Sequence, residues 1–395
     1  MTAAAERTGA VVVGGDYQGL GIVRSLGRHG VPVVVVDDEL SIGRFSRFTT
    51  RAVRAADLRD EAPCIATLLE LGRRDGLDGW VLFPTREETV VALSRHRDTL
   101  RERFRVPTPP WETVRWAWDK RGMQTVAERL GIPTARTWTL NGHGDATAIP
   151  DDARYPLVIK PAIKEHFIYA TGDKAWRADT PDELAARATQ AAAIVGPGEV
   201  LVQELIPGDG QMRFAYCTFF KDGAPVASLT VRRQRQHPPQ FGRASTLVES
   251  LDVPELEEPS TRFLREIGYY GLVELEYMLD ERDGAYKLLD VNARTWGYHS
   301  IGPAAGVDFP WLLFADQLGI AVSAPRRGRA GVRWVRLVTD TPTAVVEMLG
   351  GRLPVRRYLA SMRPLHVESV FCRDDPVPGV AELGLVPYLM VKRGF

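Results

Sequence analysis

Two stretches of alternating residues late in the chain constrain its fold more than any other feature. In residues 271–280, Val273, Leu275 and Tyr277 occupy one set of alternate positions and acidic residues occupy the other. Residues 286–294 alternate in the same way, and residues 281–284 between the two stretches are typical of a turn. Because period-two alternation is typical of half-buried strands, the sequence predicts a hairpin of two strands.

The polar faces of the two predicted strands carry the same kind of ligand atom. If the strands pair antiparallel, Glu276, Asp290 and Asn292 converge on one face. Two carboxylates and an amide oxygen, with neither cysteine nor histidine, favour Mg²⁺. Arg294 follows on the same face and is suited to bind phosphate oxygens through paired hydrogen bonds. Alternation alone leaves open an ordinary exposed face, on which acidic and basic residues mix freely.

Length and composition exclude several classes of protein. A chain of 395 residues is too long for one compact core and predicts two to four lobes. The formal net charge of zero gives no electrostatic basis for binding nucleic acid or an anionic membrane. Three separated cysteines without a CxxC pair predict a reduced, cytoplasmic chain without a cysteine-based zinc site. We expect neither a secretion signal nor a membrane span, because the apolar runs are too short.

The N-terminal residues follow the order strand, glycine loop, helix, strand. An apolar run, 10–13, precedes glycine-rich residues 14–21, and a second buried strand, 31–36, ends at Asp37 and Asp38. This order predicts an α/β lobe that opens with a mononucleotide-type βαβ unit. An acid after the second strand would suit a dinucleotide ribose, but the glycines do not have GxGxxG spacing. We expect the loop to present amides to a small anionic substrate, or simply to turn tightly.

A further strand, 79–85, ends where Arg86, Glu87 and Glu88 lead into a helix. Because ligands of parallel sheets bind at such strand ends, Arg86 and Glu88 are candidate substrate contacts. Acids that complement the helix dipole explain Glu87 and Glu88 equally well.

Three of the few lysines lie at positions where we expect a positive charge that is buried or that points toward an anion. Lys120 lies in residues 118–120, which begin a helix that runs to about residue 130, after the break at residues 107–110. Lys160 ends the apolar strand 155–161, where burying its charge is costly without an anionic partner. Lys174 follows on the next predicted strand. A chain that otherwise uses arginine is expected to keep lysine where a compact charge with rotatable donors is needed.

The order and spacing of these residues resemble the ATP-grasp superfamily. Glu276, followed fourteen residues later by Asp290-x-Asn292-x-Arg294, is similar to its metal-binding signature, whose second part is usually Glu-x-Asn-Pro-Arg. Asp290 and Ala293 depart from that pattern, and the carboxylate at 290 is one methylene shorter. The resemblance spans about residues 10–320 and implies ATP with two Mg²⁺ ions, or Mn²⁺ in their place.

For the nucleotide, the resemblance assigns contacts in the middle of the chain. Lysines at 120, 160 and 174 would hold the phosphates and the adenine edge, and residues 203–205 would form the adenine hinge. Either Asp209 or Gln211 would hold the ribose, and the sequence does not decide between them. Residues 162–172 would form a mobile loop over the phosphates, with contacts from Lys164, His166, Thr171 and Gly172. The implied ATP-binding residues are Lys120, Lys160, Lys174, Gln203, Glu204, Leu205, Asp209 and Gln211.

Residues 232–250 resemble a pattern of the carboxylate–amine ligase branch, which includes D-aspartate ligase-like proteins; the chain also resembles the large chain of carbamoyl phosphate synthase. Arginines there would neutralise the phosphoryl group in transfer. His299 would act as a base for an incoming amine, although a lone histidine beside a helix start is more often a structural hydrogen bonder. The implied catalytic residues are Arg233, Arg235, Arg294 and His299.

The fold expected is therefore α/β, with α+β lobes in four parts. A Rossmann-like preATP-grasp domain would take residues 1–115, and a linker helix and small lobe would take 116–202. The large lobe with the metal site would take 203–320, and an accessory lobe packing on the core would take 321–395.

The resemblance implies ATP-dependent ligation of a carboxylate to an amine through an acyl phosphate, with release of ADP and phosphate. Small-molecule substrates are the expected partners, without nucleic acid or membrane, and a homodimer is allowed. Another ATP-grasp activity is the first alternative: a carboxylate or carbamate kinase, or a carboxylase-like enzyme. A Rossmann-type NAD-dependent oxidoreductase and a nucleotide-sensing relic without catalysis are the others.

Overall fold

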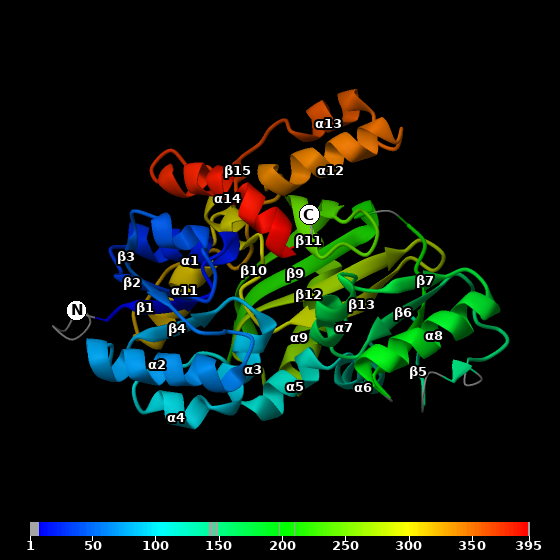
Figure 1. Cartoon of the computed structure of the whole chain (residues 1–395), viewed down its shortest axis with the longest axis horizontal. Helices are drawn as coiled ribbons and strands as arrows, with labels where there is room; N and C mark the ends of the chain where they lie inside the picture. Colours follow the sequence, from blue (N-terminus) through cyan, green and yellow to red (C-terminus); the bar gives the residue numbers. More distant parts are fainter. Residues whose placement is uncertain (1–7, 142–144, 147–148, 197, 209, 394–395) are drawn as a thin grey trace.

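Three β-sheets, joined and covered by helices, make up the computed structural model of the chain (Figure 1). The structure describes residues 8–141, 145–146, 149–196, 198–208 and 210–393. A parallel sheet lies in the N-terminal part and a small antiparallel sheet in the middle of the chain, with a seven-stranded sheet between them in space. The predicted α/β class is confirmed.

The N-terminal sheet is parallel, with the strand order β3-β2-β1-β4. Its strands are β1 (Ala10–Val13), β2 (Val33–Asp37), β3 (Thr49–Arg54) and β4 (Val81–Pro84). The valines of β1 and β2 are buried on both faces because helices cover both faces, as continuous apolar runs predict. The helices are α1 (Tyr17–Arg28), η1 (Ile42–Phe45), α2 (Glu61–Asp75), α3 (Glu87–Arg95) and α4 (Arg97–Arg101).

The glycine-rich loop between β1 and α1 is held by contacts within the protein. Gly14 has φ +98°, and a Cβ there would lie 2.1 Å from the Thr85 hydroxyl oxygen, so only glycine fits. Its N–H donates to the Val36 carbonyl (2.8 Å), and the Gly15 N–H donates to the Asp37 carboxylate (2.5 Å). Of the two expectations for this loop, the tight turn is therefore the one observed at these amides.

Two helices, α5 (Trp111–Trp118) and α6 (Lys120–Arg129), lead to the small antiparallel sheet. The α6 helix begins within the predicted start at residues 118–120, where the Asp119 carboxylate accepts from the Arg121 N–H (2.9 Å). The small sheet has the order β5-β8-β6-β7, and α8 (Pro181–Val195) packs on it. Its strands are β5 (Thr137–Thr139), β6 (Leu157–Pro161), β7 (Trp176–Ala178) and β8 (Val200–Glu204).

Residues 162–172 differ from the predicted loop. They contain the helix α7 (Lys164–Thr171), which ends at Gly172 with φ +76°. Residues 164–171 include neither glycine nor proline, and Phe167 is fully buried against the Trp176 ring. The prediction of a loop here was therefore wrong.

The central sheet has the order β13-β12-β9-β10-β11-β14-β15. The strands β12 and β13 pair antiparallel around a turn at residues 281–284, which confirms the predicted hairpin. The strands are β9 (Arg213–Lys221), β10 (Ala224–His237), β11 (Ala244–Leu251), β12 (Gly271–Asp280), β13 (Ala285–Asn292), β14 (Arg333–Val335) and β15 (Val367–Glu368). The helices between them are η3 (Gly210–Met212), η4 (Pro254–Leu256), α9 (Glu257–Glu266), η5 (His299–Ile301), α10 (Gly302–Ala305) and α11 (Phe309–Gln317).

Both faces of the central sheet are covered, so the hairpin strands are more buried than the alternation predicts. Val273, Leu275 and Tyr277 pack in the apolar cluster formed with α5, α6 and α9. The opposite face of the sheet packs on α1 and α11. Glu274 and Glu276 point to this opposite face.

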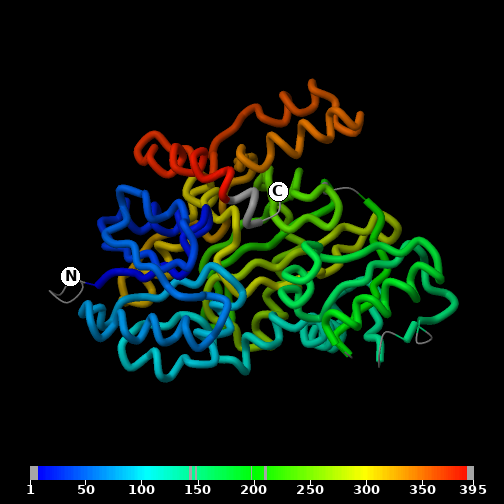
Figure 2. Tube along the Cα trace, in the orientation of Figure 1, coloured from blue at the N-terminus to red at the C-terminus, as the bar shows by residue number. Residues whose placement is uncertain are grey.

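The C-terminal residues return to both the central sheet and the N-terminal part. After β14 come α12 (Leu337–Leu349) and α13 (Val355–Ser361), and after β15 comes α14 (Val377–Arg393). Figure 2 shows this last segment lying against the N-terminal helices. Arg24 of α1 binds Asp375 (2.9 Å), and Arg336 binds Glu382 of α14 (2.9 Å), with all four side chains buried. Among the described residues, no helix has the length and apolar character needed to cross a membrane.

Candidate active site

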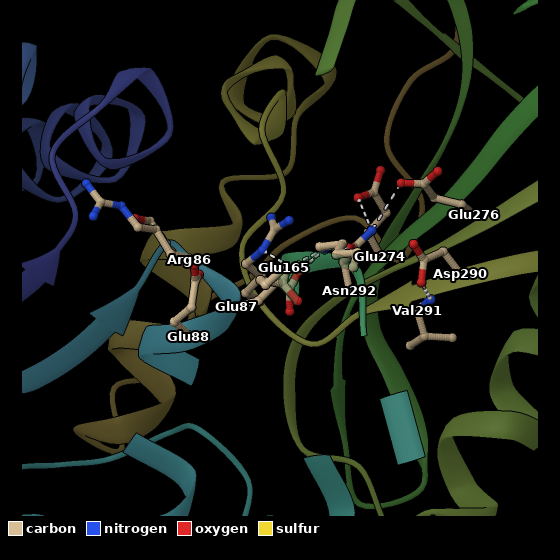
Figure 3. A network of polar contacts seen from close by, with 12 residues as sticks. Arg86, Glu87, Glu88, Glu165, Glu274, Glu276, Asp290, Val291 and Asn292 are labelled. Atoms are coloured by element: carbon tan, nitrogen blue, oxygen red, sulfur yellow. Dashed lines mark hydrogen bonds and ion pairs between the residues drawn. The ribbon is translucent and has the colours of Figure 1, made fainter. Parts of the chain in front are cut away.

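Acidic side chains and Asn292 converge on one face of the β12–β13 hairpin (Figure 3). In the antiparallel register, Glu274 lies opposite Asn292, and Glu276 lies opposite Asp290. The Asn292 amide donates to Glu274 (3.0 Å) and to Glu276 (3.1 Å). The hairpin therefore brings together the three residues predicted as metal ligands: Glu276, Asp290 and Asn292.

Cations from three other parts of the chain surround these carboxylates. Lys120 Nζ, at the start of α6, lies 2.6 Å from one Asp290 oxygen, and Lys174 Nζ lies 4.0 Å from the other. Arg233 of β10 lies 3.1 Å from Glu276. Burial opposes ionisation, but Lys120 and Lys174 hold the pKa of Asp290 well below its usual range. Against the same opposition, Arg233 and Lys174 lower the pKa of Glu276 to about 2, so both carboxyls are ionised at neutral pH.

Glu274 belongs to this cluster, although it was not predicted as a site residue. It is buried, it accepts from Asn292, and the Tyr298 hydroxyl donates to it. Burial and the neighbouring Glu276 raise the pKa of Glu274 to about 7. The alternation that places Glu276 on the polar face places Glu274 there too, so the sequence did contain a signal for it.

A first cavity lies between the small sheet and the central sheet, next to the carboxylates. One part of its lining is apolar, and the other is polar, with five cations beside three carboxylates and an amide. Such a lining suits an aromatic base joined to phosphates. The apolar part includes Val158, Leu205, Ile206, Met278 and Leu289, and the polar part includes Lys120, Lys160, Lys164, Lys174, Gln203, Glu204, Arg213, Glu276 and Asp290.

Lys160 donates to a neutral partner in this cavity, the amide oxygen of Gln203 (2.9 Å). Gln203 is itself oriented by donating to the Thr137 hydroxyl (2.7 Å). Burial, together with the charges of Lys120 and Lys174, lowers the pKa of Lys160 to about 7. An anion bound beside Lys160 would favour its charged form.

The predicted adenine hinge lines the first cavity, but part of it is engaged within the protein. The Leu205 N–H donates to the Pro156 carbonyl (3.2 Å), and the Glu204 carboxylate pairs with Arg136 (3.3 Å). Gln211 lies in η3, and Asp209 lies outside the described residues. The contacts of this segment with a nucleotide stay predictions.

A second cavity lies between the hairpin and the N-terminal part, and the two cavities share Lys164, Lys174 and Glu276. Ligands in the two cavities would therefore meet at the carboxylates of the β12–β13 hairpin, which we call the acidic hairpin. The remaining lining comes from Tyr17, Gln18, Ile168, Arg233, Arg243, Ala244, Ser245, Glu274, Asn292, Arg294, Gly297 and Tyr298.

Glu87 joins two of the cations at the second cavity. Its carboxylate accepts from Arg294 Nε and from Lys164 Nζ, each at 2.8 Å. Burial opposes ionisation, but the two cations lower the pKa of Glu87. The sequence indicated only a helix-dipole role for this residue; its burial and its partners come from distant segments.

The two candidate substrate contacts at this strand end, Arg86 and Glu88, have partners outside the cavities. Arg86 is bound by Asp37 (2.8 Å) and Asp38 (2.6 Å), and Glu88 accepts from the Tyr169 hydroxyl. Neither residue belongs to the lining of the two cavities, so the structure does not bring them to the site.

Of the four contacts predicted on residues 162–172, one reaches the cavities. Lys164 lines both cavities and lies 3.4 Å from the Asn292 amide oxygen. His166 pairs with Glu199 (2.9 Å), and the Thr171 hydroxyl donates within α7. Gly172 caps the same helix.

Arg235, which the resemblance implied as a catalytic residue, lines neither cavity. Register shifts flank Arg235 in the β10–β11 pairing, so strict alternation is lost there. Arg235 binds Asp340 of α12 through two hydrogen bonds (2.9 and 2.6 Å). Arg232 instead pairs with Glu249 (3.1 Å), and Arg233 alone of the three reaches the acidic hairpin.

His299 is also placed differently from its predicted catalytic role. It is buried, and its Nε2 lies 2.9 Å from the Gln18 carbonyl oxygen, which can only accept. It packs tightly on α1, where a Cβ at Gly21 would lie 2.6 Å from Nε2. Burial lowers its pKa. The structure therefore supports the structural hydrogen bonder and not the base.

The donor atoms at the hairpin fit a hard divalent cation. Within the described part of the chain, no cluster of three or more His, Cys, Asp and Glu side chains could hold a metal ion by itself. Mg²⁺ does not require such a cluster, because it commonly takes one or two carboxylates and completes its shell with waters and phosphate oxygens. Glu276, Asp290 and the Asn292 amide fit that kind of site.

Known proteins resemble the chain in sequence, although no family model matches it. A D-aspartate ligase of Enterococcus faecium (strain Aus0004) is 22% identical over 301 residues, which cover 72% of this chain and 70% of the relative. A D-alanine–D-alanine ligase of Pseudomonas entomophila (strain L48) is 29% identical over 212 residues, covering 50% and 63%. A carbamoyl phosphate synthase large chain of Thermomicrobium roseum (strain ATCC 27502 / DSM 5159 / P-2) is 22% identical, but the match covers only 29% of it. The chain thus spans less than two thirds of the last two relatives.

Solved structures share the fold at low sequence identity. An L-amino acid ligase from Bacillus licheniformis has a TM-score of 0.62 and 17% identity, covering 79% of this chain and 74% of the other. A biotin carboxylase complex from Campylobacter jejuni has a TM-score of 0.65 and 16% identity, covering 84% and 75%. An N5-carboxyaminoimidazole synthetase from Staphylococcus aureus, complexed with ADP, has a TM-score of 0.62 and 14% identity, covering 83% and 81%.

Proposed function

We propose that this chain, which has the ATP-grasp fold, is an ATP-dependent carboxylate–amine ligase. A carboxylate oxygen of one substrate attacks the γ-phosphorus of ATP, and the bond from that phosphorus to the β-phosphate oxygen breaks. ADP leaves, and the substrate becomes an acyl phosphate. An amine nitrogen then attacks the acyl carbon, loses a proton and expels phosphate, which leaves an amide.

One observation carries this proposal: the carboxylates of the acidic hairpin and a set of lysines line a single cavity. Glu276 and Asp290 line the first cavity together with Lys120, Lys160 and Lys174. Lysines that stand close together repel one another, and a polyanion between them would relieve that repulsion. ATP fits the cavity because its base suits the apolar end and its phosphates suit the lysine end.

The hairpin would hold magnesium through Glu276, Asp290 and Asn292. When bound, Mg²⁺ supplies positive charge that stabilises the oxygens of the phosphates in transfer. Lys120, Lys174 and Arg233 lie within 4.0 Å of these carboxylates and neutralise them. These ion pairs hold the carboxylates in place at the hairpin, which would reduce reorganisation on binding.

The second cavity is the proposed site of the carboxylate and the amine. Arg294 lines it and is oriented by Glu87, and Arg233 lines it beside Glu276. Guanidinium groups suit both a carboxylate and an acyl phosphate through paired hydrogen bonds. Ligases named for D-aspartate, D-alanine and L-amino acids among the similar proteins support an amino acid as one substrate.

Several further points belong to the proposal. Two magnesium ions would bind with ATP, and Mn²⁺ would serve in their place when Mg²⁺ is withheld. We propose a cytoplasmic enzyme, and a homodimer fits the proposal without being required by the site. The four-part division at residues 115, 202 and 320 assigns the nucleotide to the second and third parts and the other substrates to the cleft against the first part.

The test is a product screen with purified protein, Mg-ATP and pooled amino acids as carboxylate and amine donors. We expect ADP and phosphate, not AMP and pyrophosphate, together with a new amide detected by mass spectrometry. Glu276→Ala and Asp290→Ala should each abolish both products while circular dichroism shows a folded chain. Glu183→Ala, on the exposed start of α8, is a matched control that removes a carboxylate lining neither cavity and should leave both products unchanged.

Other products would identify the alternatives. ADP with a carboxylated or carbamoylated product, but without an amide from an amine donor, would favour a carboxylase-like or kinase activity; the solved biotin carboxylase shares the fold equally well. Binding of NAD(H) in place of Mg-ATP would favour an oxidoreductase. Asp37, the acid that would bind the ribose of NAD, instead accepts from the Gly15 N–H and pairs with Arg86. The glycine loop therefore gives that alternative no support. Binding of Mg-ATP without turnover of any substrate pair would favour a nucleotide sensor.

A further inference from the structure

The turn between β10 and β11 reaches both cavities. Its residues, 238–243, connect the end of β10 to the start of β11. Phe241 lines the first cavity, on which Met278 and Leu289 also lie, and Arg243 lines the second. We call residues 236–243 the hairpin tip. It belongs to the β10–β11 hairpin and is distinct from the acidic β12–β13 hairpin. A single short segment thus contributes an aromatic ring to the proposed nucleotide site and a guanidinium to the proposed substrate site.

The hairpin tip has a fixed shape. Phe241 has φ +47°, a conformation that residues other than glycine seldom adopt and that recurs at ligand clamps. Gly242 packs on Gln236, where an added Cβ would lie 2.5 Å from the side-chain amide carbon. The Gln236 amide donates to the Pro239 carbonyl (2.7 Å) and accepts from Arg213 (3.1 Å), which lines the first cavity. Strain at Phe241 therefore persists because the surrounding contacts hold the turn.

Helix α12 holds the base of the hairpin tip from outside the site. Asp340 is fully buried and accepts two hydrogen bonds from Arg235 and one from Thr246 (2.7 Å). Three residues further along α12, Thr343 meets His237 Nδ1 at 2.8 Å. The Thr343 hydroxyl donates to the Thr339 carbonyl (2.7 Å), so His237 Nδ1 carries the hydrogen of that contact.

We propose that Asp340 and Thr343 are positioning residues of the active site. Through Arg235 and His237 they fix the hairpin tip so that Phe241 covers the apolar end of the nucleotide cavity and Arg243 reaches the second substrate. Neither positioning residue lines a cavity, so they act through the tip and not by contact with a ligand. This inference rests on the proposed function and gives the C-terminal segment a role in it.

The physical consequence concerns nucleotide affinity first. An aromatic ring over the base excludes water and adds buried apolar contact, whereas a tip free to move would have to be ordered at each binding event. Arg243 is exposed within the second cavity, where a guanidinium can meet a carboxylate. Loosening the tip should therefore weaken nucleotide binding and raise the KM for the carboxylate substrate together.

The test is the affinity for MgADP, measured by titration calorimetry on the full chain. Phe241→Ala should weaken binding about 10-fold, the loss expected for removing an aromatic contact. Asp340→Asn and Thr343→Val should each weaken it by about 3- to 10-fold, no more than the loss of the Phe241 ring, although neither side chain touches the ligand. Glu347→Gln is the matched control, because Glu347 lies on the same helix, pairs only with Arg352 beyond the helix end among the ion pairs described (2.7 Å), and lines neither cavity, so the affinity should stay unchanged.

The double variant Thr343→Val/Phe241→Ala separates positioning from a general loss of stability. If Thr343 acts through the tip, the double variant binds no more weakly than Phe241→Ala alone. Additive losses, or a lowered melting temperature with unchanged MgADP affinity, would overturn the inference. If Asp340→Asn does not fold, Thr343→Val, which replaces a hydroxyl with a methyl group, decides the outcome. Failure of the wild-type chain to bind MgADP would instead overturn the proposed function, and the inference with it.

Discussion

Lys120 Nζ and Asp290 Oδ1 form a buried ion pair at 2.6 Å, although 170 positions separate the two residues in the chain. The pair joins the start of α6 to the end of the β12–β13 hairpin, so it holds the first cavity together at its polar end. Replacing Asp290 by asparagine leaves Lys120 buried without a full counter-charge. We expect Asp290→Asn to lower the free energy of unfolding by about 3 kcal/mol, measured by urea denaturation.

Asp290→Glu is the informative partner of that variant. It keeps the charge and introduces the residue more usual in the resembling signature. The protein should keep its stability within about 1 kcal/mol and keep MgADP binding. If Asp290→Glu binds nucleotide no better than Asp290→Asn, the carboxylate does not act as a metal ligand.

Nucleotide binding should take up a proton above neutral pH. Burial, together with the charges of Lys120 and Lys174, lowers the pKa of Lys160 to about 7. Phosphate groups beside it would raise that pKa, so at pH 8 about one proton should be taken up per MgADP bound. Calorimetry in buffers of different ionisation enthalpy measures this uptake. Lys160→Arg stays charged at all these pH values and should abolish the uptake; an unchanged uptake would assign it elsewhere.

The same pKa predicts how stability changes with pH. In the unfolded chain, Lys160 releases its proton near its ordinary pKa of 10.5, whereas in the folded chain it does so near 7. Between these values the unfolded chain binds more protons, so the Lys160 contribution to the free energy of unfolding rises with pH. Lys160→Met should flatten that rise, and a thermal denaturation series from pH 7 to pH 10 would detect the difference.

Arg294 should affect the chemical step and not nucleotide affinity. It lines the second cavity, and its Nε donates to Glu87 at 2.8 Å. We expect Arg294→Ala to reduce kcat for ADP release by about 100-fold, the loss typical of removing one charge-stabilising donor. MgADP affinity, measured separately, should stay unchanged; a large loss of affinity would place Arg294 at the nucleotide instead.

His299 should prove dispensable for catalysis. His299→Leu removes the hydrogen bond from the imidazole to the buried Gln18 carbonyl and should cost about 0.5–1.5 kcal/mol of stability. His299→Gln keeps a donor and should recover part of that loss. Both variants should retain turnover at temperatures where they are folded. A folded His299→Gln variant with no turnover would restore the base role predicted from sequence.

Local patterns predicted much of the site. Alternation in residues 271–294 located the hairpin and brought Glu276, Asp290 and Asn292 to one face, because side-chain direction in a strand follows from position. The lysines at 120, 160 and 174 were predicted from helix and strand ends and from the order of motifs, and all three line one cavity.

What could not be predicted depends on long-range packing or on irregular backbone. Arg235 turns to Asp340 because register shifts interrupt the alternation, and no residue type announces such a shift. Glu87 is a buried counter-ion only because α3 meets α7 and the segment after β13. The strands β14 and β15 have three and two residues, too few to show a period.

Tracing a carboxyl oxygen into the released phosphate tests most directly whether the protein forms an acyl phosphate. Amino acids labelled with ¹⁸O in their carboxyl groups are incubated with the protein, Mg-ATP and an amine, and the phosphate released is examined by ³¹P NMR. Transfer through an acyl phosphate places one carboxyl oxygen in each phosphate, so we expect singly ¹⁸O-labelled phosphate beside ADP and an amide. Unlabelled phosphate, or release of AMP and pyrophosphate, would contradict it.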